Sequence, residues 1–161
     1  MNQQEIKDNL AEQVVFKILE TTQLDLNNTK KYIPNINYGK VIKVYDGDTI
    51  TIATQLYNGS FIPSKDIYKF SVRLNGIDTP EIKTSNIAEH TLAIIARDAL
   101  SALVMDKVVR LEQISYDKYG RLLCNVFVQK DGVFVDVCKW MIDHNYAIVY
   151  HGGHKNPVAW D

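Results

Sequence analysis

Three short stretches of the chain place acidic and basic side chains beside turn-forming residues. They are "YDGDT" at 45–49, "VRLNGIDTPE" at 72–81 and "DKYGR" at 117–121. Carboxylate and carbonyl oxygens are the ligands that Ca²⁺ prefers. Arginine is the side chain that grips pairs of phosphate oxygens. These residue types therefore fit a metal ion held next to a phosphate group.

The second stretch supplies the strongest candidates for metal ligands. Pro80 fixes its own φ and restricts Thr79 to extended conformations, so the chain bends rigidly between Asp78 and Glu81. We expect Asp78, the main-chain carbonyl of Thr79 and Asp48 from the first stretch to be the ligands. A helix that begins at Thr79 is the alternative reading. It is disfavoured because the helical hydrophobic pattern starts several residues later.

The first stretch also has a simpler explanation. Asp46-Gly47-Asp48 suits a tight hairpin turn, because Asp tolerates turn geometry and Gly adopts positive φ without steric cost. Taken alone, it predicts a turn whose carboxylates are solvated. Its part in a site depends on its combination with the second stretch.

Arg73 and Arg121 supply the positive charge. Most arginines lie on the surface, and that is the alternative for both. A guanidinium group, however, is planar and permanently charged, which suits a phosphate that gains charge in its transition state. A metal, a carboxylate base and two arginines together are the components that phosphodiester hydrolysis requires.

The hydrophobic pattern predicts the elements that carry these residues. Runs rich in β-branched and aromatic residues predict strands at 40–45, 49–57, 68–75, 107–114 and 121–129, with a last short strand at 146–150. Helices are expected over 87–105, capped by Thr84 or Ser85, and over 136–145. Five strands with a helix between the third and fourth match an OB-fold, a small barrel of the α+β or mainly β class.

The beginning of the chain has a different character. Residues 3–24 show near-helical spacing of apolar residues, and an Asn-rich segment with Pro34 and Gly39 follows. We therefore predict an N-terminal amphipathic helix and linker over 1–38, and the barrel domain over 39–161.

The composition limits the possible classes of protein. The net charge of -1 provides no long-range positive field to attract a polyanion. Cys124 and Cys138 lack CxxC spacing and read as small buried thiols. Neither a signal peptide nor a transmembrane segment is recognisable, so an intracellular protein with no membrane partner is expected.

The three stretches, in this order, resemble the staphylococcal nuclease (thermonuclease) family. The resemblance covers about residues 40–150. It implies an OB-fold endonuclease that uses Ca²⁺ to hydrolyse DNA and RNA, preferably single-stranded, and leaves 3′-phosphate ends. Transferred residue by residue, it implies Asp48, Asp78 and the Thr79 carbonyl as metal ligands.

The resemblance also implies roles for the remaining residues of the site. Glu81 would take a proton from the attacking water or organise that water, and Arg73 and Arg121 would bind the phosphate. Tyr119 and Tyr150 are further candidates that could stack on a base or touch a phosphate. For both tyrosines a half-buried core position is an equal alternative.

The chain departs from the family in two ways. From Lys40 onward it has fourteen basic and fourteen acidic side chains, whereas family members are strongly basic. It also ends about ten residues after Tyr150, where members continue into a further helix. The helix within 3–24 is expected either to take that place or to make a dimer contact, and a monomer is the expected state.

Two other functions are consistent with parts of the sequence. A non-catalytic OB-fold module that binds nucleic acid or protein would have the same barrel, but such a module is expected to lose at least one of the five charged site residues. A zinc site built from Cys138, His144, His151 and His154 is disfavoured, since the spacing lacks the usual ligand pairs.

Overall fold

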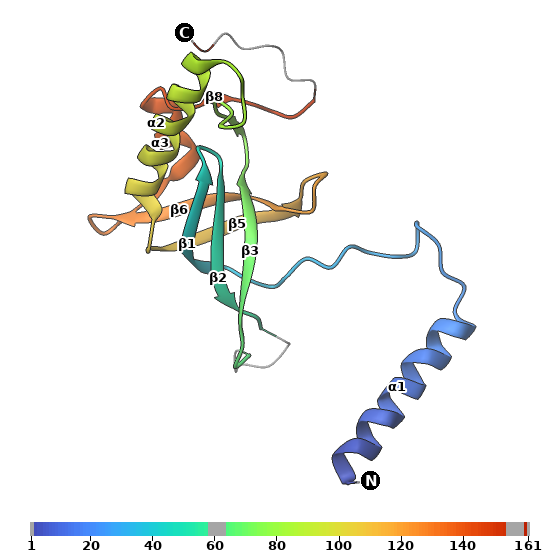
Figure 1. Ribbon diagram of the computed structural model, residues 1–161. Coiled ribbons are helices and arrows are strands. Elements are labelled where there is room, and N and C mark those ends of the chain that lie inside the picture. Colours follow the sequence, from blue (N-terminus) through green and yellow to red (C-terminus); the bar gives the residue numbers. More distant parts are fainter. Residues whose placement is uncertain (1, 58–63, 154–159, 161) are drawn as a thin grey trace. The chain divides into compact units, whose positions relative to one another are not determined.

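The computed structural model describes residues 2–57, 64–153 and 160. The chain divides into two compact units, Met1–Tyr32 and Ile33–Asp161. All strands belong to the second unit (Figure 1). The division predicted at residue 38 stays a prediction about domain organisation.

The first unit consists of helix α1, Gln3–Thr21, and the segment after it. A capping box begins the helix: the Asn2 side chain accepts a hydrogen bond from the Glu5 amide at 2.9 Å, and Glu5 accepts one from the Asn2 amide at 2.6 Å. No residue of α1 is buried, and its large apolar side chains are about half exposed. Both hypotheses about this helix, docking on its own barrel or a dimer contact, stay predictions.

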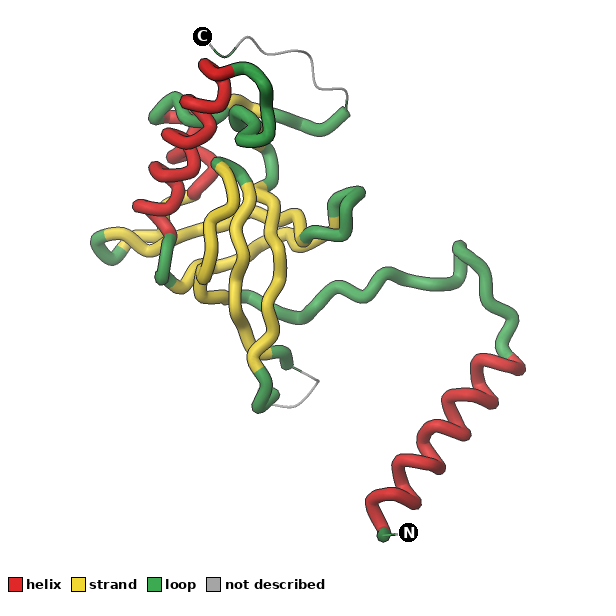
Figure 2. The backbone as a smooth tube through the Cα atoms, viewed as in Figure 1, coloured by secondary structure: helices red, strands yellow, loops and turns green. Residues whose placement is uncertain are grey.

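Five strands of the second unit form a closed barrel (Figure 2). They are β1 Tyr38–Asp46, β2 Thr49–Gln55, β3 Ile67–Leu74, β5 Val108–Tyr116 and β6 Leu122–Lys130. Their order is β3-β2-β1-β5-β6, and a parallel pairing of β3 with β6 closes the barrel. The other pairings among them are antiparallel. The predicted five-stranded OB-type fold is confirmed.

Alternating side chains of these strands fill the barrel. Ile50 and Ile52 of β2 and Val72 and Leu74 of β3 are fully buried, while the residues between them face outward. Helix α2, Ile87–Val104, packs against β1, and helix α3, Val137–Asp143, packs against β6. The core therefore fixes the direction in which each outward residue points, Arg73 included.

Several local details differ from the sequence predictions. Helix α2 is capped by Asn86, whose side chain accepts from the amides of Ala88 and Glu89, and not by Thr84 or Ser85. Three short strands complete the fold: β4 Ile77–Asp78, β7 Val133–Asp136 and β8 Ile148–Val149. The sequence did not predict β4 and β7, because two to four residues are too few for a hydrophobic period. Strand β8 is shorter than the predicted 146–150.

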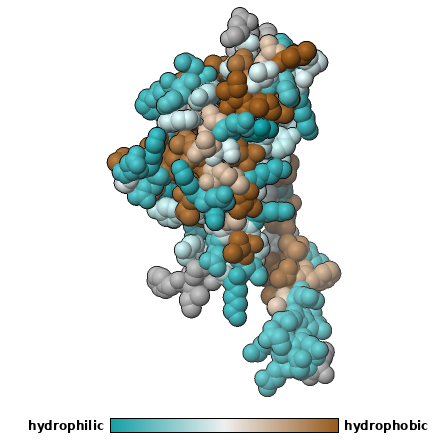
Figure 3. Space-filling view, turned by 60° about the vertical axis from the view of Figure 1, so that its left-hand side comes forward, coloured by the Kyte–Doolittle hydropathy of each residue, from teal (hydrophilic) through white to brown (hydrophobic). Residues whose placement is uncertain are grey.

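The surface mixes hydrophilic and hydrophobic residues on the face drawn in Figure 3.

Cys124 and Cys138 are free and buried, as predicted, and burial raises the pKa of both thiols to about 12. None of the helices within the described residues is long and apolar enough to cross a membrane.

Candidate active site

The turn between β1 and β2 brings the first two sequence stretches together. A Cβ atom on Gly47 would lie 2.9 Å from Thr79 Cγ2 and 3.0 Å from Ala96 Cβ, so only glycine fits there. The predicted reason for this glycine was wrong, since its φ is not in the positive range. Close packing of the turn on Thr79 requires it, and this packing sets Asp48 beside Asp78.

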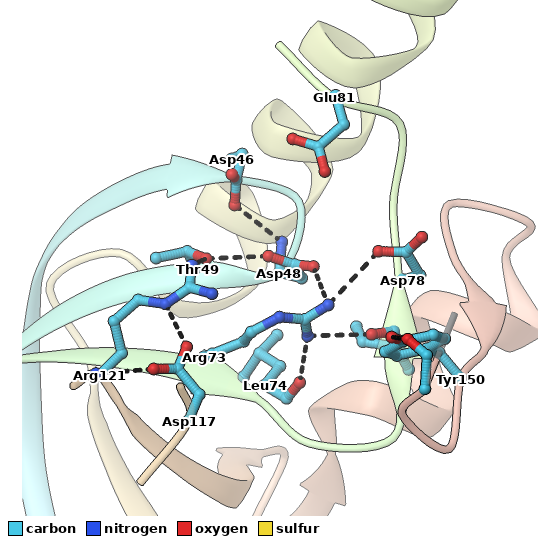
Figure 4. Close-up of polar contacts among 12 residues, drawn as sticks. Asp46, Asp48, Thr49, Arg73, Leu74, Asp78, Glu81, Asp117, Arg121 and Tyr150 are labelled. Atoms are coloured by element: carbon cyan, nitrogen blue, oxygen red, sulfur yellow. Dashed lines mark hydrogen bonds and ion pairs between the residues drawn. The ribbon is translucent and has the colours of Figure 1, made fainter. Parts of the chain in front are cut away.

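Asp48 and Asp78 share one arginine nitrogen (Figure 4). Nη2 of Arg73 lies 2.9 Å from Asp48 Oδ2 and 3.3 Å from Asp78 Oδ1. Both carboxylates are buried. Residues from the β1–β2 turn, strand β3 and strand β4 therefore meet at one point, as the predicted ligand set requires.

The guanidinium of Arg73 is held from its other side by the main chain. Its Nη1 donates to the carbonyls of Leu74 and Ile77, both at 3.0 Å. The side chain is only 12% exposed, and it lies 5.9 Å from the centre of the Tyr150 ring. Arg73 is thus an internal charge with a fixed position and not a mobile surface arginine.

The pKa of Asp48 reflects the burial of its carboxylate and the charges around it. Burial raises its pKa to about 7, the Arg73 charge opposes that rise, and neighbouring Asp46 adds to it. Asp46 also accepts a hydrogen bond from the Asp48 amide at 3.2 Å. The positive charge of Arg73 therefore does not fully offset the effect of burial on the Asp48 carboxylate.

The donor set fits a hard cation better than a soft one. Asp48, Asp78 and the carbonyl of the buried Thr79 offer only oxygen, the ligand type of Ca²⁺ and Mg²⁺. Within the described ranges no cluster of three or more His, Cys, Asp and Glu side chains could hold a metal. The two carboxylates and one carbonyl would hold such an ion, with water as the further ligands.

The residues considered for zinc do not form a site in the described part of the chain. Cys138 lies in the hydrophobic core. His144 stacks on Trp140, with ring centres 4.1 Å apart, and its Nδ1 contacts the Trp140 carbonyl oxygen at 2.8 Å. His154 lies outside the described residues.

Glu81 follows the Pro80 bend and is exposed, in contrast to Asp78. Its carboxylate points toward the space next to Asp48 and Asp78 (Figure 4). The Glu81 amide donates to Glu89 Oε1 at 3.3 Å, which ties the bend to the first turn of α2. A carboxylate facing both the pair and solvent is in a suitable place to accept a proton from water.

Arg121 reaches the site from the turn between β5 and β6. Its Nε donates to Asp117 Oδ2 at 2.6 Å, and its Nη1 donates to Thr49 Oγ1 at 3.1 Å. Thr49 in turn donates to Asp48 Oδ1 at 2.8 Å. Nη2 of Arg121 has no hydrogen-bond partner among the described residues, so it can donate to a ligand.

Asp117 is a residue that the sequence reasoning did not single out. Its Oδ1 accepts from the amides of Tyr119 and Arg121, at 2.8 and 2.9 Å. Burial raises the pKa of Asp117, but the hydrogen bonds and charge of Arg121 and the Tyr119 amide outweigh it, so the net pKa is lowered. The Asp at the start of "DKYGR" was a possible signal, because Asp often accepts from amides two and more residues ahead in turns.

Thr49 and Asp46 were also quoted in the first stretch without a role in the site, and the structure places both in contact with Asp48 or its amide.

The two predicted tyrosines differ in exposure. Tyr119 is 72% exposed, and the Arg121 guanidinium lies 5.5 Å from its ring centre. Tyr150 is partly buried just after β8, and its hydroxyl donates to the Gly153 carbonyl at 2.8 Å. Tyr119 therefore has the larger surface available for a ligand.

The fold and the site together define a class: a small OB-type barrel whose rim carries buried carboxylates, two arginines and an exposed glutamate. A family model described as "Staphylococcal nuclease homologue" matches residues 71–158, more than half of the chain. The chain belongs to this family.

Relatives found by sequence carry names consistent with this assignment. An uncharacterised protein of Methanocaldococcus jannaschii is 29% identical over 70% of this chain and 59% of its own length. An uncharacterised endonuclease of Haemophilus influenzae is 33% identical over 76% of this chain and 57% of its own. A thermonuclease of Staphylococcus hyicus is 33% identical over 57% and 49%. The chain spans about half to three fifths of the length of these relatives.

Proposed function

We propose that this chain is a nuclease that hydrolyses phosphodiester bonds of DNA and RNA with Ca²⁺ as its cofactor, preferring single strands and leaving 3′-phosphate ends. One observation carries the proposal: one Arg73 nitrogen joins two buried carboxylates, beside an exposed glutamate and a second arginine whose Nη2 has no partner among the described residues. Two relatives named endonuclease and thermonuclease support the nuclease part of the proposal.

In the proposed reaction, Asp48, Asp78 and the Thr79 carbonyl hold the cation. When bound, the cation supplies charge neutralisation at a phosphate oxygen and a place for the attacking water. Glu81 accepts a proton from the water, whose oxygen then bonds to phosphorus. The bond from phosphorus to the 5′ oxygen breaks, and that oxygen takes a proton from solvent to leave as a 5′ hydroxyl, while Glu81 returns its proton to solvent.

The arginines act on the charge that develops at phosphorus. Nη2 of Arg121 is directed to a non-bridging oxygen, while Asp117 and Thr49 keep the guanidinium in place. Arg73 offers a second fixed positive charge within the carboxylate cluster. Groups held before the substrate arrives need no reorganisation during the reaction, which strengthens their effect.

The decisive experiment compares wild type with Glu81→Gln on heat-denatured DNA, in millimolar Ca²⁺ or in chelator. Acid-soluble nucleotides should be released by wild type with Ca²⁺ only, and release should fall by at least about 10² in the variant. The products should carry 3′ phosphates. Binding without release under any divalent cation would overturn the proposal and favour the non-catalytic module.

A further inference from the structure

The outer face of the sheet next to the site is unusually basic for this chain. Strands β1, β2 and β3 expose three lysines, Lys40, Lys43 and Lys69, and carry one acidic side chain, Asp46. The whole chain has a net charge of -1. The basic residues are therefore concentrated where the catalytic proposal already places a polyanion.

The pairing of the strands arranges these residues in rows that start at the site. Thr49 pairs with Arg73, and in the next row Lys43, Thr51 and Ser71 are paired with one another. The third row is Lys40, Ala53 and Lys69. Side chains two residues apart on a strand share a face, so the three rows lie on the outer side of the barrel.

An open pocket connects the site to the second row. It has a volume of about 210 Å³ and is lined by Lys43, Tyr45, Thr49, Thr51, Ser71 and Arg121. Tyr45 is 43% exposed as a whole residue, and the Lys43 ammonium lies 5.7 Å from the centre of its ring. The pocket therefore offers an aromatic surface beside a cation, next to the arginine proposed to bind phosphate.

We propose that these rows bind the segment of a single-stranded nucleic acid that adjoins the cleaved phosphate, with one base stacked on Tyr45 and successive phosphates on Lys43 and then Lys40 and Lys69. This assignment rests on the proposed function for the position of the cleaved bond. Neighbouring rows lie two residues apart along each β-strand and are therefore separated by roughly 6.6 Å. This spacing is close to the distance between successive phosphates in an extended nucleic-acid strand. Only an unpaired base exposes a face to an aromatic ring, which selects single strands over duplexes.

The test measures binding and cleavage separately. Binding is measured on the Glu81→Gln background, with fluorescent oligothymidylate and oligouridylate of about twelve nucleotides as the DNA and RNA arms. Lys43→Glu with Lys69→Glu is the test variant. Lys7→Glu with Lys130→Glu is the matched control, since both lysines are exposed and the change in net charge is equal.

We expect the test variant to raise the Kd at least tenfold at about 50 mM salt, and to reduce the slope of log K against log salt by about 1.4, or 0.7 per lost phosphate contact. The control should stay within about twofold. Tyr45→Ala should raise the Kd without changing the salt slope, because stacking releases no counterions. If affinity falls more for one of the two oligonucleotides, the rows bind that kind of nucleic acid, DNA or RNA.

Cleavage by chains with Glu81 intact separates this inference from the proposed function. Lys40→Glu with Lys69→Glu, both in the third row, should raise KM for the twelve-nucleotide strand much more than for a dinucleotide, because a dinucleotide does not reach that row. Unaltered Kd and salt slope, an equal loss in the control, or an equal loss for a duplex of the same length would overturn the binding rows. If none of the variants cleaves the strand, only the nuclease proposal is overturned.

Discussion

The two arginines of the site are held in different ways. Arg73 donates to two carboxylates and two main-chain carbonyls contributed by three segments of the fold. Arg121 depends mainly on Asp117, four residues earlier in the same turn, and its Nη2 has no hydrogen-bond partner in the part of the chain that the structure describes. Arg73 is consequently part of what holds the carboxylates in place, whereas Arg121 is positioned by its own turn and by Thr49, and its proposed role is to bind a phosphate.

The difference separates stability from catalysis. Removing Arg73 leaves two buried carboxylates without their shared cation, which should harm folding as well as activity. Arg121 is 28% exposed and pairs with a surface turn, so its loss should affect folding little. Substitutions at the two positions should therefore differ most clearly when activity and stability are measured on the same samples.

The largest effect is expected at Arg121. Arg121→Lys keeps a positive charge but loses the planar fork that reaches Asp117, Thr49 and phosphate together. We expect kcat/KM to fall by about 10³ or more, as for arginines that stabilise phosphoryl transfer elsewhere, while the free energy of unfolding changes by less than about 1 kcal/mol. Arg97→Lys, in an exposed pair with Asp98, is the control. A rate loss below tenfold would contradict the assignment.

The next largest effect is on the stability of Arg73→Gln. Breaking a buried ion pair by removing one partner costs roughly 3–5 kcal/mol, and denaturant unfolding in chelator should show a loss of this order. Excess Ca²⁺ should restore part of it, because a cation would again neutralise Asp48 and Asp78. Arg97→Gln should change stability by no more than about 0.5 kcal/mol. Equal behaviour of the two variants would show that Arg73 does not hold the cluster together.

A smaller and opposite change is expected for Asp48→Asn. Burial raises the pKa of Asp48 to about 7, so the folded protein binds a proton more tightly than the unfolded chain. The stability of metal-free wild type should therefore fall as the pH rises from about 4 to about 7. Asp48→Asn removes this dependence and should be more stable at neutral pH by on the order of 1–2 kcal/mol, although cleavage is lost. A variant less stable than wild type in chelator at pH 7.5 would disprove the argument.

The sequence was sufficient for the barrel and for most of the charged residues near the site. Alternating runs such as residues 68–75 are long enough to show a period, and Pro80 announces a bend by its own geometry. Short strand β4 could not be found in this way, because its two residues are defined only by pairing with β8. That pairing is what brings Asp78 into the cluster.

Gly47 shows a different limit of sequence reasoning. Its neighbours suggest a turn that needs positive φ, but the structure requires glycine for its small size against Thr79 and Ala96. Asp117 likewise looks like a solvated turn residue until its contacts with Arg121 are seen. Both residues depend on partners distant in sequence or on side-chain direction, which local patterns do not contain. The metal, the substrate and the roles of the site residues stay predictions.

The smallest effect is expected at Asp117, whose substitution tests how far the local turn positions Arg121. Asp117→Asn can still accept from the two amides, but it loses the charge that pairs with Arg121 Nε, so cleavage should slow by about tenfold, less than in Arg121→Lys. The lowered pKa of Asp117 means that its contribution to stability is present above about pH 4 and disappears as the pH falls through the folded pKa. The stability difference between wild type and variant should accordingly shrink in acid. Asp143→Asn, in an exposed pair with Lys139, should change neither rate nor pH dependence. If Asp117→Asn lost as much activity as Arg121→Lys, Arg121 would depend on this one carboxylate for its function, and the contrast between the two arginines would become sharper.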